Sequence, residues 1–162
     1  MFTKKVKSKY FLVEAGKTYT GINIQWPASA IIMTGKKTVE TRIYPLSQSL
    51  IGKELILVET PGDAKNGGCF GEVGKQPEKR RMVALIVFGE NIHYANKKEF
   101  YADKRHLITP DSPWRWNDKP KWGWLITSLK VFDKPIPLTK NIGIKTTNGL
   151  TLPPNIKMRT VV

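Results

Sequence analysis

The segment at residues 34–42, TGKKTVETR, brings together the side chains that could do chemistry in this chain. Successive side chains of an extended strand alternate between its two faces. One face of this segment and its continuation is then polar: Thr38, Glu40, Arg42 and Tyr44. The opposite face suits a hydrophobic core: Val39, Thr41 and Ile43. The polar face is therefore either solvated surface or the lining of a pocket.

As a pocket lining, the polar face would combine an acid with several cations. Arg42 offers a planar fork for a phosphate or a base edge, and Glu40 could orient that fork. Glu40 could instead accept a hydrogen bond from the exocyclic amine of cytosine or adenine. Lys36 and Lys37 add positive charge, and a partly desolvated Lys37 beside a guanidinium could act as a general base. Lys37 and Glu40 are therefore the candidate catalytic residues.

Two further groups of aromatic residues could stack on bases. Trp26 lies directly before a short helix expected at residues 28–33, although a tryptophan in that position also suits the core. The segment at 112–124, SPWRWNDKPKWGW, interleaves tryptophans with basic residues, as surfaces that bind single strands do. Its candidate ligand contacts are Trp114, Arg115 and Trp116. The alternative is that these rings simply pack against the fold.

The charge balance favours a polyanionic partner. The chain has 162 residues with 27 Lys and Arg against 13 Asp and Glu, a formal charge of +14 that would attract RNA. A single cysteine, Cys69, excludes an intrachain disulfide and a multi-cysteine zinc site, and the two histidines lack the close spacing of a metal site. We therefore expect no metal or cofactor. No apolar run approaches the roughly 20 residues of a membrane span and no secretory signal is visible, so we expect a cytoplasmic protein.

The hydrophobic pattern predicts a mostly β chain with short helices. Turn signals separate strands expected at residues 7–15, 18–26, 37–45, 52–60, 82–95 and 122–132. The strand at 82–95 is apolar on both faces at its start and should be central. Helices are expected at 28–33 and 96–108. Without a regular alternation of strand and helix, this pattern favours one α+β domain over residues 1–162, built on a small, mostly antiparallel barrel.

The run NIQWPASAIIMTGKKTVETR, from residue 23, resembles the ASCH domain, a branch of the PUA-like superfamily. That family combines an apolar strand, a short Pro-led helix and a Gly-x-Lys-x-x-Glu-x-Arg motif. The motif positions are filled here by Gly35, Lys37, Glu40 and Arg42. The likeness extends over about residues 20–138, with an N-terminal hairpin before it and a C-terminal tail, wrapped or frayed, after it. It implies a small PUA-like β-barrel with a cleft beside the motif.

The resemblance also implies a role in RNA or nucleoside biology, because family members bind RNA, cleave it or hydrolyse acetylated cytidine. The hydrolase subgroup uses a lysine, a threonine and a glutamate. Lys37 matches that lysine, whereas Glu40 takes the threonine's place. The subgroup's glutamate lies near the second helix, where Glu99 and Asp103 are the nearest candidates. We therefore expect binding of RNA or a modified nucleoside. The alternatives are a metal-independent ribonuclease or N4-acetylcytidine-type amidohydrolase, and a protein-interaction module.

Overall fold

The computed structural model describes residues 6–62, 70–71, 73–138 and 146–162. These residues form eight strands: β1 (Lys9–Leu12), β2 (Tyr19–Gln25), β3 (Val39–Arg42), β4 (Leu55–Thr60), β5 (Arg81–Tyr94), β6 (Lys121–Pro137), β7 (Thr146–Leu150) and β8 (Asn155–Thr160). They also form the helices α1 (Ala28–Met33) and α2 (Lys97–Ala102), and a 3-10 turn at Lys104–His106. No helix in these ranges is long and apolar enough to cross a membrane. Cys69 lies outside the described residues.

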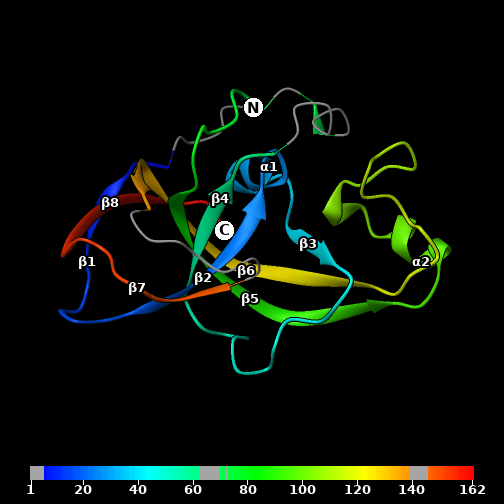
Figure 1. Cartoon of the computed structure of the whole chain (residues 1–162), viewed down its shortest axis with the longest axis horizontal. Coiled ribbons are helices and arrows are strands. Elements are labelled where there is room, and N and C mark those ends of the chain that lie inside the picture. The colour runs from blue at the N-terminus through cyan, green and yellow to red at the C-terminus, as the bar shows by residue number, and fades with distance from the viewer. Residues whose placement is uncertain (1–5, 63–69, 72, 139–145) are drawn as a thin grey trace.

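The described strands belong to one sheet. Its order is β1-β8-β6-β5-β4-β2-β7, and β3 adds to β6 off this path. Only β2 and β4 pair in parallel among these strands. The long strands β5 and β6 lie side by side along the molecule, with α2 near one end and β1 and β8 near the other (Figure 1). The expected mostly β, α+β fold is confirmed, although the ladder of described strands curls without closing.

The core occupies both faces of the sheet, and β4 shows why. Leu55 and Leu57 pack into one hydrophobic cluster, which includes residues of β2 and α1. The alternate residues Ile56 and Val58 pack into a second cluster with side chains of β5, β6 and β8. A strand buried on both faces must be apolar at successive positions, as the sequence of β4 is. The same holds for the first half of β5, which lies between β4 and β6, as predicted.

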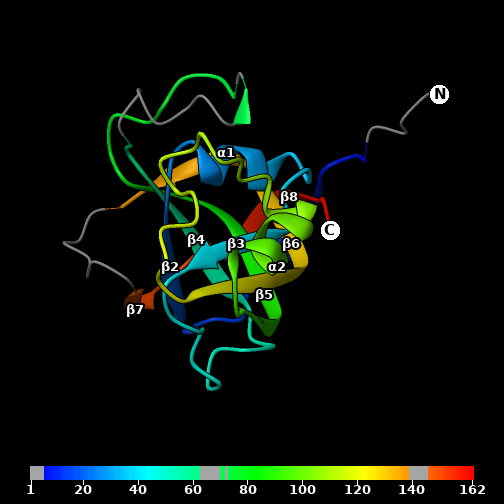
Figure 2. The same ribbon diagram turned by 90° about the vertical axis from the view of Figure 1, so that its right-hand side faces the viewer.

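Helix α1 delivers the polar motif to one end of the curled sheet. Pro27 precedes the helix, where its missing N–H is not needed, and Ile31 and Ile32 on its inner side are buried. The helix ends at Met33 and Thr34 caps it. The next residue, Gly35, has a φ of +81°, in the left-handed region that glycine adopts without strain. The chain then reverses directly into β3, which pairs with β6. Figure 2 shows α1 on one side of the sheet and α2 near β3.

The prediction that β1 and β2 form an N-terminal hairpin is wrong. A turn does follow β1, with the Lys17 N–H donating to the Glu14 carbonyl at 3.2 Å. However, β1 pairs with β8, whereas β2 pairs with β4 and β7. The turn therefore carries the chain between two distant places in the sheet. Local turn signals cannot reveal this, because the partner strand comes from the other end of the chain.

The described part of the C-terminal tail, from residue 146, forms two strands of the sheet. Strand β7 extends the β2 edge, and β8 lies between β1 and β6. Ile156 and Met158 of β8 are buried in the second cluster, whereas Lys157 between them is exposed. This period-2 burial fixes the register of β8, because a shift of one residue would expose both apolar side chains.

We expect Met158→Ala to lower the free energy of unfolding by about 2–4 kcal/mol, because it removes a fully buried side chain and leaves a cavity. The matched control is Lys157→Ala on the exposed face, which should change stability by less than about 0.5 kcal/mol. Urea unfolding of both variants measures the difference. Equal, small effects would show that β8 is not part of the folding unit in solution.

Candidate ligand-binding cleft

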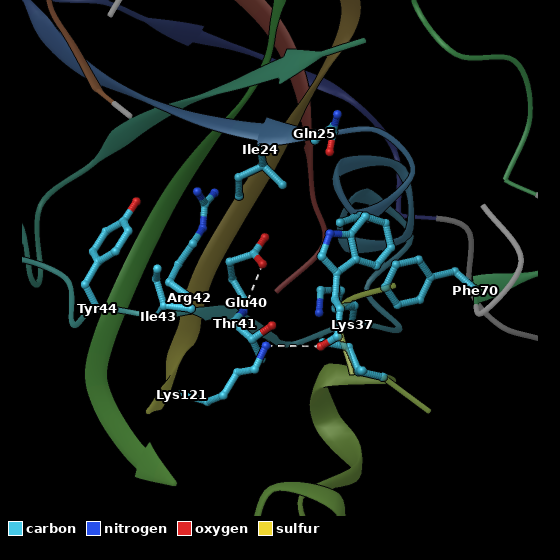
Figure 3. A pocket seen from close by; sticks show the side chains of 13 residues that line it. Ile24, Gln25, Lys37, Glu40, Thr41, Arg42, Ile43, Tyr44, Phe70 and Lys121 are labelled. Carbon is cyan, nitrogen blue, oxygen red and sulfur yellow. Dashed lines mark hydrogen bonds between the residues drawn. The ribbon is translucent and has the colours of Figure 1, made fainter. Parts of the chain in front are cut away.

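A cleft of about 310 Å³ opens beside β3, and five residues expected from the sequence line it (Figure 3). Those five are Lys37, Glu40, Arg42, Tyr44 and Trp114. Strand β3 supplies Glu40 and Arg42, the loop before it Lys37, and the loop before β6 Trp114. A volume of this size falls at the lower end of the range for small-ligand sites. Three of the four residues of the predicted polar face therefore line a pocket, whereas Thr38 is not among the lining residues.

Lys37 is buried at the base of this arrangement, with 1% of its surface exposed. Its Nζ donates to the His106 carbonyl at 2.7 Å and lies 5.4 Å from the centre of the Phe70 ring. A buried ammonium needs such partners, because its desolvation is otherwise strongly unfavourable. The contact with His106 also ties the motif loop to the turn after α2.

His106 is held by both ring nitrogens. Nε2 donates to the Phe100 carbonyl at 2.6 Å, and Nδ1 accepts from the Ile108 N–H at 2.9 Å. This pattern requires the neutral ring, protonated at Nε2 only. Burial lowers the pKa of His106, and the nearby charge of Lys37 lowers it further. His106 therefore stays neutral and keeps its carbonyl in place for Lys37.

A second polar network supports the same turn. Asp103 accepts hydrogen bonds from the Tyr94 hydroxyl at 2.6 Å and from Arg105 Nε at 2.8 Å. Burial alone would raise the pKa of Asp103, but the hydrogen bonds from Arg105 and Tyr94 hold it well below its usual range. Burial and the Asp103 carboxylate raise the pKa of Tyr94. Asp103 is thus a structural carboxylate, and neither it nor Glu99 is among the residues that line the cleft.

Glu40 is 6% exposed and only partly satisfied. Its Oε1 accepts from the Thr41 N–H at 2.8 Å. Within the described residues, Oε2 is buried and has no hydrogen-bond partner. Buried polar atoms in native structures are normally paired, so Oε2 is an acceptor that a group from outside the chain could satisfy.

Arg42 is partly engaged by the protein itself. Its Nη2 donates to the Asn23 carbonyl at 2.6 Å, and the guanidinium lies 5.3 Å from the ring centre of Trp124. These contacts aim the planar group along the cleft wall. Tyr44, which meets Trp124 edge to face at 5.8 Å, closes the same end.

Trp114 contributes an aromatic wall to the cleft. It is half-buried and stacks on Phe70 with a centroid separation of 5.6 Å. Trp116 takes a different position, packing on Phe100 at 5.8 Å, and is not among the lining residues. Exposed Arg115 lies between them in sequence and donates to the Ser112 carbonyl at 3.4 Å. The structure therefore brings one of the two loop tryptophans to the cleft.

Two other expected contacts lie away from the lining. Trp26 is 9% exposed and packs in the core, the alternative that the sequence left open. Lys36 is exposed beyond the end of α1. The core face expected for β3 also ends early: Val39 is buried, but Thr41 and Ile43 line the cleft, and Ile43 is 61% exposed. For Ile43 the reason is that β3 stops at Arg42, after which the alternation of a strand no longer applies. Thr41 lies inside β3, and its position in the lining has no explanation in the strand alternation.

Sequence reasoning missed Lys121, the first residue of β6. It is 7% exposed, lines the cleft and donates to the Trp114 carbonyl at 3.3 Å. Burial lowers the pKa of Lys121. The local signal for it is its place among the basic residues that alternate with tryptophans at 112–124. Phe70 and Ile108 were also missed, since nothing nearby in the sequence links them to the motif.

Comparison of structures supports the fold. The sequence matches no protein-family model and no curated protein. The structure is similar to an ASCH protein from Zymomonas mobilis, with a TM-score of 0.53 and 12% identity over 82% of this chain and 87% of that one. For a tyrosine-to-phenylalanine variant of that protein, the TM-score is 0.52, with 12% identity over 82% of this chain and 90% of that one. For a serine-to-alanine variant, the TM-score is 0.50, with 13% identity over 82% of this chain and 88% of that one. At these identities the similarity establishes a shared fold, the one that the sequence led us to expect.

The depressed pKa of His106 predicts a loss of stability on acidification. The unfolded chain binds a proton near the ordinary pKa of 6.5, whereas the folded chain does not, so stability is complete above 6.5 and falls as the pH drops below it. We expect about 1 kcal/mol to be lost between pH 7.5 and 5.5, measured by urea unfolding. The His106→Asn variant should have a lower free energy of unfolding at pH 7.5, and this free energy should change less between pH 7.5 and 5.5. An unchanged slope in the variant would mean that another group titrates.

Proposed function

We propose that this protein is a member of the ASCH family in the PUA-like superfamily, and that its cleft binds RNA or a modified nucleoside. The observation that carries the proposal is one small cleft that combines three cationic side chains, a flat aromatic wall and a buried carboxylate. The cations are Lys37, Arg42 and Lys121. Nucleotides offer a partner for each part: a phosphate for the cations, a ring for the wall and an N–H group for the acid.

The charges favour an anionic ligand over a neutral one. Three cations and one acid line the cleft, and the chain carries a net charge of +14. Each phosphate contact with a lysine or arginine releases counterions, so RNA affinity should fall steeply between low and physiological salt. A salt titration of RNA affinity separates this proposal from a protein-interaction module. For such a module, RNA binding would be absent or would change little with salt.

The cleft size favours a single nucleotide over a duplex. A space of about 310 Å³ admits one base with its sugar. Single-stranded RNA can present such a base because its bases are free to turn outward and stack on aromatic side chains. Trp114 is the side chain that could take this role.

Hydrolysis in the same cleft is the second candidate function. Lys37 and Lys121 are both buried, and burial makes Lys121 easier to deprotonate, as its lowered pKa indicates. A neutral lysine could take the proton of the RNA 2′-hydroxyl as that oxygen bonds to phosphorus, and the second lysine, protonated, could give a proton to the departing 5′-oxygen, while Arg42 steadies the phosphate. The same groups could serve amide hydrolysis of an acetylated cytidine. Glu40 would hold or relay the proton.

The loop tryptophans provide a matched pair of variants for the binding proposal. Trp114→Ala should weaken binding of a fluorescent single-stranded RNA by about 1–3 kcal/mol, because stacking on its ring is lost. Trp116→Ala should have a smaller effect, since that ring packs on Phe100. Fluorescence anisotropy at low salt gives both affinities. Equal weakening in both variants would show that Trp116 also contacts RNA. Unchanged binding in both variants would contradict a role for Trp114 in stacking on a base.

The catalytic alternative predicts loss of turnover without loss of fold. If the cleft hydrolyses its ligand, Lys37→Met and Glu40→Gln should each lower turnover by roughly 10²-fold or more. The double variant should be little worse than either single one, because groups acting as a unit are not additive. The assay compares single-stranded RNA with acetylated cytidine. A wild-type protein that binds but leaves both substrates intact would restrict the function to binding, and activity that survives Lys37→Met would place catalysis elsewhere.

A further inference from the structure

Glu40 differs from the other deeply buried glutamate of the sheet. Glu59, which is 1% exposed, has both carboxylate oxygens occupied: Oε2 accepts from the Ser29 hydroxyl at 2.6 Å, and Oε1 from Arg81 Nε at 2.9 Å. Glu40 has a partner at Oε1 only, and no donor from the described residues reaches Oε2. The fold can satisfy a buried carboxylate fully and does so at Glu59. The vacant oxygen of Glu40 therefore marks a place for an N–H or O–H group of a ligand.

The cations around Glu40 restrict what that ligand group can be. Figure 3 shows the Glu40 carboxylate between Arg42 and Lys37, and Lys121 lines the same cleft. These charges repel an ammonium or guanidinium ligand. The donor to Oε2 should therefore be a neutral N–H group. The ligand atoms beside it should be acceptors, because they face side chains that only donate.

Among the four RNA bases, uracil has this arrangement. Its N3–H lies between two carbonyl oxygens, so its Watson–Crick edge presents an acceptor, a donor and an acceptor. Cytosine and adenine place an amino donor beside a ring-nitrogen acceptor, and guanine presents two donors side by side. A single vacant carboxylate oxygen with cations on both sides is complementary to the uracil pattern. Proteins that read unpaired RNA bases commonly do so on this edge.

We propose that the cleft selects uridine, with Glu40 Oε2 accepting from the uracil N3–H. Arg42 is suited to one flanking carbonyl, because it uses Nη2 on the Asn23 carbonyl and carries further N–H donors on the same plane. The cleft lysines are suited to the other carbonyl, and the Trp114 ring to the face of the base. This inference rests on the proposed function and adds the identity of the base.

The test changes one hydrogen of the ligand. The full chain is titrated, at low salt, with four fluorescent RNA oligomers of equal length that differ at one central nucleotide: uridine, 3-methyluridine, cytidine or adenosine. The oligomer with 3-methyluridine keeps both carbonyl oxygens but lacks the N3–H. We expect the uridine oligomer to bind at least about tenfold more tightly than the other three. Glu40→Leu, checked for folding by its melting temperature, should bind uridine and 3-methyluridine alike.

The outcomes separate this inference from the function on which it rests. RNA binding with no discrimination against 3-methyluridine, or with cytidine preferred, would overturn uridine selection and leave RNA binding intact. Absence of binding to every oligomer would overturn both. Should Glu40→Leu fail to fold, the wild-type comparison of uridine with 3-methyluridine still decides the matter, because it needs no variant.

Discussion

The contact on which the rest of the cleft depends is the one between Lys37 and the His106 carbonyl. A buried ammonium must find acceptors, and this carbonyl is 2.7 Å away. It is held there because the neutral His106 ring is fixed at both nitrogens and because Asp103 anchors the same turn to Tyr94. The loop before β3 and the turn after α2 are thereby joined. The hydrogen bond from Lys37 thus connects two segments that lie far apart in the sequence.

This arrangement buries charged side chains in the cleft, where a ligand could supply further partners for them. Lys37, Lys121 and Glu40 are each more than nine-tenths buried. Burying charged groups is unfavourable unless each is paired, and a buried pair often stabilises a protein less than apolar packing would. Such groups are concentrated at sites that bind or react. The fully satisfied Glu59 shows that the same fold can bury a carboxylate without leaving an atom unpaired.

The sheet provides the rigid frame for this site, and both ends of the chain contribute to it. Strand β8 lies between β1 and β6, so the C-terminal segment covers one side of the core that the central strands leave open. At the other end of the long strands, β3 pairs with β6 and presents Glu40 and Arg42. The structural similarity to the Zymomonas mobilis protein concerns this frame. The same frame can carry different chemistry, so the side chains of the cleft, not the fold, decide the function.

The sequence by itself determined the features that depend on neighbouring residues. Proline before α1 and glycine after it set the bounds of that helix, continuous apolar residues placed β5 in the centre, and strand alternation put Glu40 and Arg42 on one side. Tertiary structure decided the rest. Lys121 and Phe70 reach the cleft from distant segments, Trp114 faces it while Trp116 packs on Phe100, and β1 pairs with β8 instead of β2. The physical reason is that burial and strand pairing depend on contacts between residues far apart in the chain, such as Lys37 and His106. Local propensity reflects neighbouring residues only, so it cannot predict these contacts.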